Sequence, residues 1–178
     1  MRHLFRGLLG AAAICFGCLP AVAASTLPGG ASSLTEAHGD WTVRCAVTTA
    51  GGAVNCGVSQ EQLDKGTHKR MLLIGINAGS EGGATGSLVL PFGLALESGV
   101  TLQVDDGTVT SPLHFRTCLP AGCVVPINWN KASVDALRTA KTVKAAAVSD
   151  NGQPAPFTIS MAGFASALDR AIELVSAK

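Results

Sequence analysis

Two pairs of cysteines, each bracketing a turn, constrain this chain more than any other feature. An antiparallel fold about Ala50-Gly51 places Cys45 opposite Cys56 and Trp41 opposite Gln60. Because side chains alternate along a strand, this register puts the neighbouring apolar residues on one face. Directly opposed residues of a non-hydrogen-bonded pair lie about 4.5 Å apart at Cα, within disulfide reach. The pattern predicts a hairpin closed by a Cys45–Cys56 bond.

The second pair, Cys118 and Cys123, flanks the sequence Leu-Pro-Ala-Gly. Pro suits the first corner of a turn and Gly tolerates positive φ, so a Cys118–Cys123 bond is expected to clamp a turn between two strands. A zinc site favours C-x-x-C-like spacing, and a thioredoxin-type redox centre places C-x-x-C at a helix N-terminus. The two cysteine pairs have ten and four intervening residues, so structural disulfides are favoured over both alternatives.

Disulfides persist in oxidising compartments, and the N-terminal residues predict export to one. Residues 1–24 contain two arginines, an apolar run from Leu8 to Leu19 and the small residues of a cleavage site at 21–23. This composition is typical of a cleaved secretory signal peptide. The apolar run is shorter than the roughly 20 residues of a membrane-spanning helix. We expect a mature protein that begins at Ala24 or Ser25, in the periplasm, at the cell surface or secreted.

Charge and motifs argue against several classes of function. Loss of Arg2 and Arg6 with the signal leaves eleven Lys and Arg, from thirteen, against twelve Asp and Glu. No basic patch favours nucleic acid, and the absence of Tyr disfavours a stacking platform for bases. No G-x-S-x-G elbow, H-E-x-x-H, EF-hand or dinucleotide fingerprint occurs in the sequence. The sequence therefore predicts no catalytic, metal-binding or cofactor-binding residues and no cofactor.

The organisation of the chain is typical of a small β protein. Residues 25–37 are rich in Ser, Thr, Gly and Ala and are expected to form a flexible lead-in to a single domain over 38–178. Short strands separated by Gly-rich turns predict an all-β sandwich. Apolar residues alternate over 88–96, where Pro91 and Gly93 indicate an edge or bulged strand.

Two helices are expected toward the C-terminus. A short helix is predicted around 134–139, with Asn130 or Ser133 as its N-cap. The closing segment has apolar residues at helical spacing, which predicts a helix that packs one face on the body of the protein. A membrane-surface helix is disfavoured because the polar face is not basic. The residues expected on the packed face are Phe164, Leu168, Ile172 and Val175.

Two further segments draw attention to possible sites. The Gly-rich segment Gly79–Gly86 lacks the Gly-Lys-Ser/Thr ending of a P-loop, so we expect a surface loop that carries binding specificity. Asp106-Gly107 is a strong hairpin signal, predicted to pair Val104 with Val109. The resulting polar face holds Asp105 and His114 without an activated nucleophile, so a solvated surface is favoured over a catalytic pair.

Four motifs in order resemble one known family. The chain resembles the invasion-associated locus B family of exported proteins, found mainly in alphaproteobacteria. The resemblance implies one immunoglobulin-like β-sandwich domain, in the periplasm or on the outer surface, and in pathogenic members a link to host-cell entry. With the helices predicted above, the expected fold is an all-β, immunoglobulin-like β-sandwich with a short helix and a C-terminal helix. It supplies no catalytic residue and no cofactor. The motifs are Trp41–Cys45 followed by Cys56 and Gln60, Leu90–Leu96 followed by Gly99, Phe115–Cys123, and Ser160–Leu168.

These observations favour a non-enzymatic binding or envelope-associated protein. We expect a mature form that is soluble or peripherally attached to the envelope and a partner that is a protein or envelope component. One alternative is a periplasmic enzyme whose site forms only in three dimensions, and another is a chaperone-like protein that offers an edge strand to a client. A pocket with convergent polar groups favours the enzyme, whereas an exposed apolar surface or an open edge strand favours a binding protein.

Overall fold

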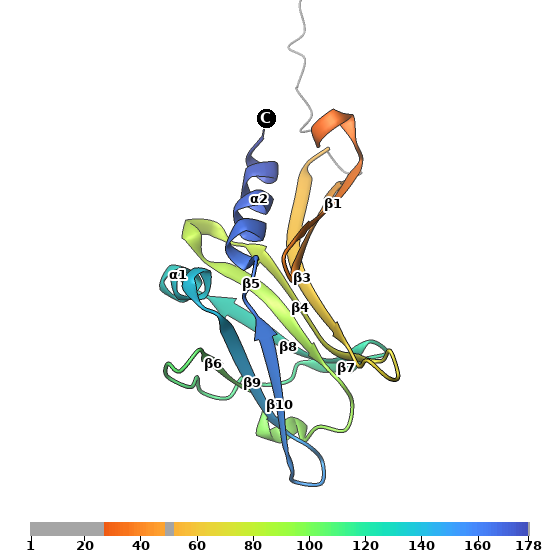
Figure 1. Ribbon diagram of the computed structural model, residues 1–178, viewed down its shortest axis with the longest axis vertical. Helices are drawn as coiled ribbons and strands as arrows, with labels where there is room; N and C mark the ends of the chain where they lie inside the picture. The colour runs from red at the N-terminus through yellow and green to blue at the C-terminus, as the bar shows by residue number, and fades with distance from the viewer. Residues whose placement is uncertain (1–26, 49–51, 178) are drawn as a thin grey trace, which may run out of the picture.

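The computed structural model describes residues 27–48 and 52–177, and in this part of the chain ten strands form two antiparallel sheets (Figure 1). The large sheet has the order β1-β2-β3-β4-β5-β8-β7 and the small sheet the order β10-β9-β6. The strands of the large sheet are β1 (Ser33–His38), β2 (Trp41–Val47), β3 (Val54–Leu63), β4 (Arg70–Ala78), β5 (Ala84–Leu90), β8 (Gly122–Trp129) and β7 (Thr117–Leu119). Those of the small sheet are β10 (Pro154–Ser160), β9 (Thr142–Val148) and β6 (Thr101–Val104).

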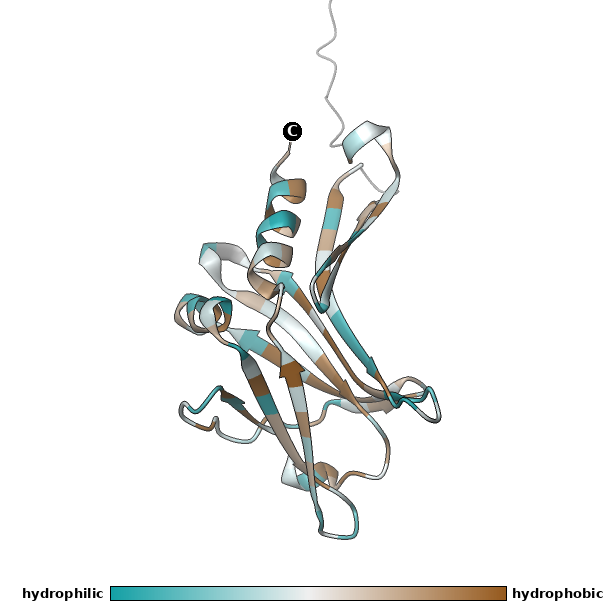
Figure 2. Ribbon diagram, in the orientation of Figure 1, coloured by the Kyte–Doolittle hydropathy of each residue, from teal (hydrophilic) through white to brown (hydrophobic). Residues whose placement is uncertain are grey.

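Helices complete the second layer of the sandwich. The α helices are α1 (Lys131–Thr139) and α2 (Phe164–Ser176), and the 3₁₀ turns are η1 (Pro28–Gly30), η2 (Ser80–Gly82) and η3 (Leu96–Ser98). Figure 1 shows α2 continuing directly from β10, and it packs on β2 and β3. Hydrophobic and hydrophilic residues alternate along the strands in Figure 2, as expected where one face of each sheet is buried. The all-β, immunoglobulin-like sandwich with two helices expected from the sequence is confirmed.

A buried polar cluster joins the two sheets. Gln60 is only 4% exposed, and its side chain donates to the Ser160 carbonyl (2.8 Å) and accepts from the Ser160 amide (3.2 Å). The Trp41 indole donates to the same carbonyl at 2.9 Å. The Trp41 ring also packs on Phe164, with 4.9 Å between centroids. The motif residues Trp41 and Gln60 therefore hold β10, through Ser160, and the start of α2, through Phe164, against the large sheet.

Both disulfides predicted from the sequence are present. Cys45 bonds to Cys56 across β2 and β3, which pair in the expected register. Cys118 bonds to Cys123 across the turn between β7 and β8. The turn about Ala50-Gly51 and the predicted signal peptide lie outside the described residues. Asn130 caps α1 as expected, since its side-chain oxygen accepts from the Ser133 amide.

Residues 25–37 were expected to form a flexible lead-in, and this is wrong for Leu27 and for residues 33–37. Leu27 is buried against the core, and Ser33–His38 form β1 at the edge of the large sheet. Six residue pairs join β1 to β2 without interruption. The segment lacks an apolar run because its strand is at an edge and only half-buried, so its hydropathy does not reveal it.

Two strand expectations around residues 88–116 are also wrong. β5 is a central strand between β4 and β8, and it ends at Leu90, so Pro91 lies outside the hydrogen-bonded ladder and does not require an edge. The predicted hairpin forms a tight turn, but Gln103 rather than Val104 opposes Val109. On its other side, β6 pairs with β9.

Candidate binding groove

The C-terminal helix leaves two large apolar side chains uncovered. Ile172 is 41% exposed and Val175 is 48% exposed, whereas the sequence pattern predicted both on the packed face. The buried residues are instead Phe164, Ala167, Leu168, Ala171 and Leu174. Ala167 and Ala171 allow the helix backbone to approach the sheet closely, which rotates the packed stripe away from Ile172 and Val175. The expectation was correct for Phe164 and Leu168 and wrong for the last two residues.

These two side chains stand at the rim of a groove of about 660 Å³. One wall is α2, the second is α1, and the end wall is formed by the close of β4 and the loop that follows it. Cys56 of the first disulfide also borders the groove, so the disulfide supports its wall. The apolar lining consists of Val54, Ala78, Val134, Leu168, Ala171, Ile172 and Val175.

The charged groups of the α1 wall are paired with opposite charges. Lys131 Nζ lies 2.6 Å from Asp135 Oδ2, one helical turn away. Arg138 bridges the two helices through a 2.7 Å contact with Asp169 on α2, and this hydrogen bond raises the pKa of Arg138. Because each cation has a carboxylate beside it, the rim offers little net charge to select a charged ligand. The groove is suited to an uncharged apolar group.

The Gly-rich segment singled out in the sequence contributes to this groove. Gly79, Gly82 and Gly83 line it, so the loop forms part of the groove wall. The loop is shorter than predicted, because Ala84–Gly86 already belong to β5. A side chain at Gly86 would place Cβ 2.1 Å from the Gly75 carbonyl oxygen, so this glycine permits the close approach of β4 and β5.

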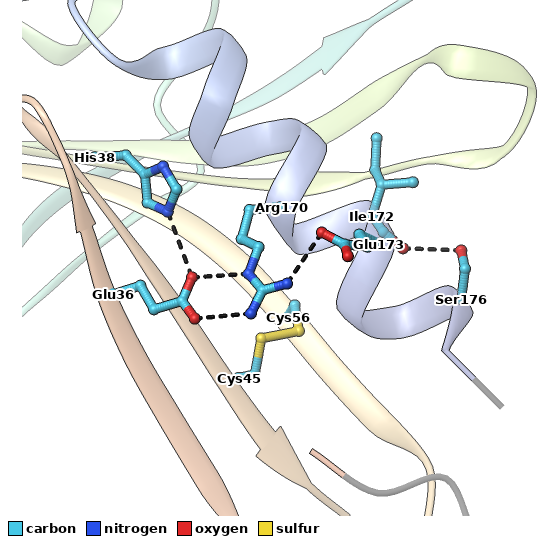
Figure 3. The surroundings of a disulfide bond; sticks show 8 residues. All are labelled: Glu36, His38, Cys45, Cys56, Arg170, Ile172, Glu173 and Ser176. Atoms are coloured by element: carbon cyan, nitrogen blue, oxygen red, sulfur yellow. Dashed lines mark hydrogen bonds and ion pairs between the residues drawn. A yellow bond between two sulfur atoms is a disulfide. The ribbon is translucent and has the colours of Figure 1, made fainter. Parts of the chain in front are cut away.

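On the other side of α2, a charged cluster ties the helix to β1 (Figure 3). Arg170 Nε and Nη2 donate to the two carboxylate oxygens of Glu36 at 2.9 and 3.0 Å. A third donor, Nη1, bonds to Glu173 at 3.0 Å. The hydrogen bonds to Arg170 hold the pKa of Glu36 below its usual value, against the opposing effect of partial burial. The fork geometry fixes the helix on the edge strand rather than forming a ligand site.

Ser166, His38 and Glu36 have the residue types of a catalytic triad but not its arrangement. His38 Nδ1 lies 3.3 Å from Ser166 Oγ, and His38 Nε2 lies 3.5 Å from Glu36. The Ser166 hydroxyl donates to the Gly163 carbonyl, so its hydrogen is directed away from the imidazole. Glu36 already accepts from two of the three donor nitrogens of Arg170. A structural role in anchoring α2 accounts for all these contacts.

The His-Asp pair considered on the 103–116 segment does not form. Asp105 accepts from the backbone amides of Lys141 and Thr142, at 3.0 and 2.8 Å, which fixes the end of β6 to β9. These hydrogen bonds, first of all the one from the Thr142 amide, lower the pKa of Asp105. His114 is exposed and makes no side-chain hydrogen bond within the described chain. This outcome agrees with a solvated surface.

The described residues contain neither a cluster of metal ligands nor a membrane-spanning helix. Among residues 27–48 and 52–177, no three His, Cys, Asp or Glu side chains are grouped so that they could hold a metal ion. Over the same residues, no helix has the length and apolar character to cross a bilayer. The fold and the groove together define a small disulfide-bonded β-sandwich whose C-terminal helix borders an open apolar groove.

Comparisons with known proteins identify the family. The family model for Invasion associated locus B (IalB) protein matches residues 41–171, and the chain belongs to this family. It is 41% identical over 151 residues to an Invasion protein B homolog of Brucella abortus (strain 2308), covering 83% of this chain and 84% of that protein. It is 36% identical over 158 residues to Invasion protein B of Bartonella bacilliformis, covering 87% and 82%.

A solved structure supports the same assignment. The crystal structure of invasion associated protein B from Bartonella henselae matches with a TM-score of 0.73 and 33% sequence identity. The match covers 80% of this chain and 97% of that chain. The family suggested by the sequence motifs is therefore confirmed. The motif residues Trp41 and Gln60 bond through their side chains to the backbone of Ser160, and so help to hold the two layers together.

Proposed function

We propose that this chain is an exported, non-enzymatic binding protein of the bacterial envelope, in the periplasm or at the cell surface. The observation that carries this proposal is the apolar groove between α1 and α2, with Ile172 and Val175 exposed at its rim. Concave sites lined mainly by apolar side chains are the usual form of a binding site. The relatives are named for invasion, which supports a role in contact between bacterium and host cell.

The occupant that fits this groove is an uncharged apolar segment of a partner protein or envelope component. Burial of apolar surface contributes about 25 cal/mol per Å², so two exposed branched side chains at a concave rim can anchor such a segment. The paired charges of Lys131 with Asp135 and Arg138 with Asp169 give no preference for an ionic ligand. The Gly79–Gly83 loop at the end of the groove then limits the length of the segment.

Two double variants separate groove binding from general surface stickiness. Ile172→Ser with Val175→Ser removes the apolar rim, and Val109→Ser with Leu96→Ser removes two side chains of similar exposure, 52% and 44%, elsewhere. We expect the wild type and the second variant to recover the same envelope component in quantitative capture, and the first variant to lose it while keeping its circular dichroism spectrum. Equal recovery by all three proteins, or turnover of a substrate by the purified protein, would contradict the proposal.

A further inference from the structure

The edge strand β1 differs from the other sheet edges in being unprotected. It has six residues, pairs with β2 without a bulge and contains neither Lys nor Pro, and its one carboxylate, Glu36, is paired with Arg170 of α2. Natural β proteins protect exposed edges with such residues, with short strands or with covering segments, because a bare edge accepts a further strand. Among the strands described, β1 pairs only with β2, so no described strand covers its second side.

Each remaining edge carries such a device. At the far end of the large sheet, β7 has only three residues, and the part of β8 that extends beyond it contains Pro126. On the outer side of β6, Val109 bridges to Gln103, and Leu113 bridges to Val100 just before the strand. β10 contains Pro154 and Pro156, and its Thr158 and Ser160 carbonyls accept from the side chains of Gln62 and Gln60.

The hydrogen-bonding groups of the open edge can be assigned from the β1–β2 ladder. The Val47 amide donates to the Ser32 carbonyl, so even-numbered residues of this segment face β2. In an antiparallel pair the next residue points its amide and carbonyl the other way. Ser33, Thr35 and Ala37 therefore direct their backbone groups to the open side, and all three residues are exposed.

The same strand is complementary to itself. With Thr35 on a two-fold axis, Thr35 opposes its own copy, Ser33 opposes the second copy's Ala37, and Leu34 opposes the second copy's Glu36. Cross-strand Thr pairs are favourable, and no like charges are directly opposed. Moving the axis to Glu36 would oppose two carboxylates, so the Thr35 register is preferred. Glu36 is also already neutralised by Arg170 of its own chain.

We propose that β1 is an interaction surface for a second copy of this chain, which adds its own β1 antiparallel about a two-fold axis at Thr35. The two large sheets then become one continuous sheet, and the contact is isologous, as in most homodimers. A six-residue edge buries less area than a standard interface of roughly 1,600 Å², so the dimer is weak and forms at high concentration.

The test uses the mature protein in sedimentation equilibrium up to millimolar concentration. We expect a monomer–dimer equilibrium that Ala37→Lys weakens at least roughly tenfold, since it places a charge at the pairing edge. Ala46→Lys is the matched control, because Ala46 is equally exposed one strand further in and should leave the equilibrium unchanged. Thr35→Pro removes an outward amide that β2 does not use, and should abolish the dimer.

Hydrogen exchange provides a readout that does not depend on any variant. The amides of Ser33, Thr35 and Ala37 should become protected as the concentration rises, while exchange at Leu34 and Glu36 stays unchanged. A protein that is monomeric at every concentration, or a dimer that Ala37→Lys leaves intact while these three amides exchange freely, would overturn the proposal.

Discussion

At the residue scale, Gly163 combines a positive φ with a close backbone neighbour. Its φ is +89°, and an added Cβ would lie 1.9 Å from the His38 carbonyl oxygen. Gly152 has a similar φ of +82° but open space around it, so it is a matched control. We expect Gly152→Ala to cost about 1–2 kcal/mol from backbone strain alone, and Gly163→Ala to cost a further 1–3 kcal/mol from overpacking. Urea unfolding measures both, and equal losses would show that the close approach of α2 to the β1–β2 turn is unimportant.

At the scale of elements, the contact between α2 and β1 is expected to depend on pH. Arg170 lowers the pKa of Glu36 in the folded protein. The stabilisation from this ion pair is therefore complete above the pKa of Glu36 in the unfolded chain, and it is lost as pH falls through the pKa of Glu36 in the folded protein. Glu36→Gln should therefore lower the free energy of unfolding at pH 7. The difference in this free energy between variant and wild type should be smaller at about pH 3. Glu97→Gln, at an exposed position, is the control. Urea unfolding at both pH values measures this difference. The same difference at pH 7 and at about pH 3 would contradict the assignment.

The elements that the sequence predicted well are those fixed by neighbours in the chain. The β2–β3 register followed from alternation around Cys45 and Cys56, and the α1 cap followed from Asn130. The contacts that the sequence did not predict join segments that lie far apart in the chain. The Glu36–Arg170 pair spans 134 residues, and no local pattern indicates that α2 packs beside β1. The prediction of the buried face of α2 was partly wrong for the same reason. The residues that pack against the sheet include the small side chains Ala167 and Ala171, which the apolar spacing did not indicate.

At the scale of the whole molecule, the sequence predicted a scaffold better than a site. Trp41 and Gln60 were expected to face each other, but only the structure shows that both bond to Ser160 and so close the sandwich. The groove combines β3, β4, α1 and α2, four elements whose arrangement follows from the fold as a whole. The Gly79–Gly83 loop and the helical residues Leu168, Ile172 and Val175 had local signals, but no local pattern indicated that they lie together.

The central claim is that this chain is exported and that two disulfide-closed hairpins hold the scaffold on which the groove is built. Non-reducing peptide mapping of the protein from a periplasmic extract tests it most directly. We expect an N-terminal peptide that begins at Ala24 or Ser25, no free thiol, and peptides joined through Cys45–Cys56 and Cys118–Cys123. Retention of Met1, or a peptide that joins Cys45 to Cys118 or Cys123, would contradict it.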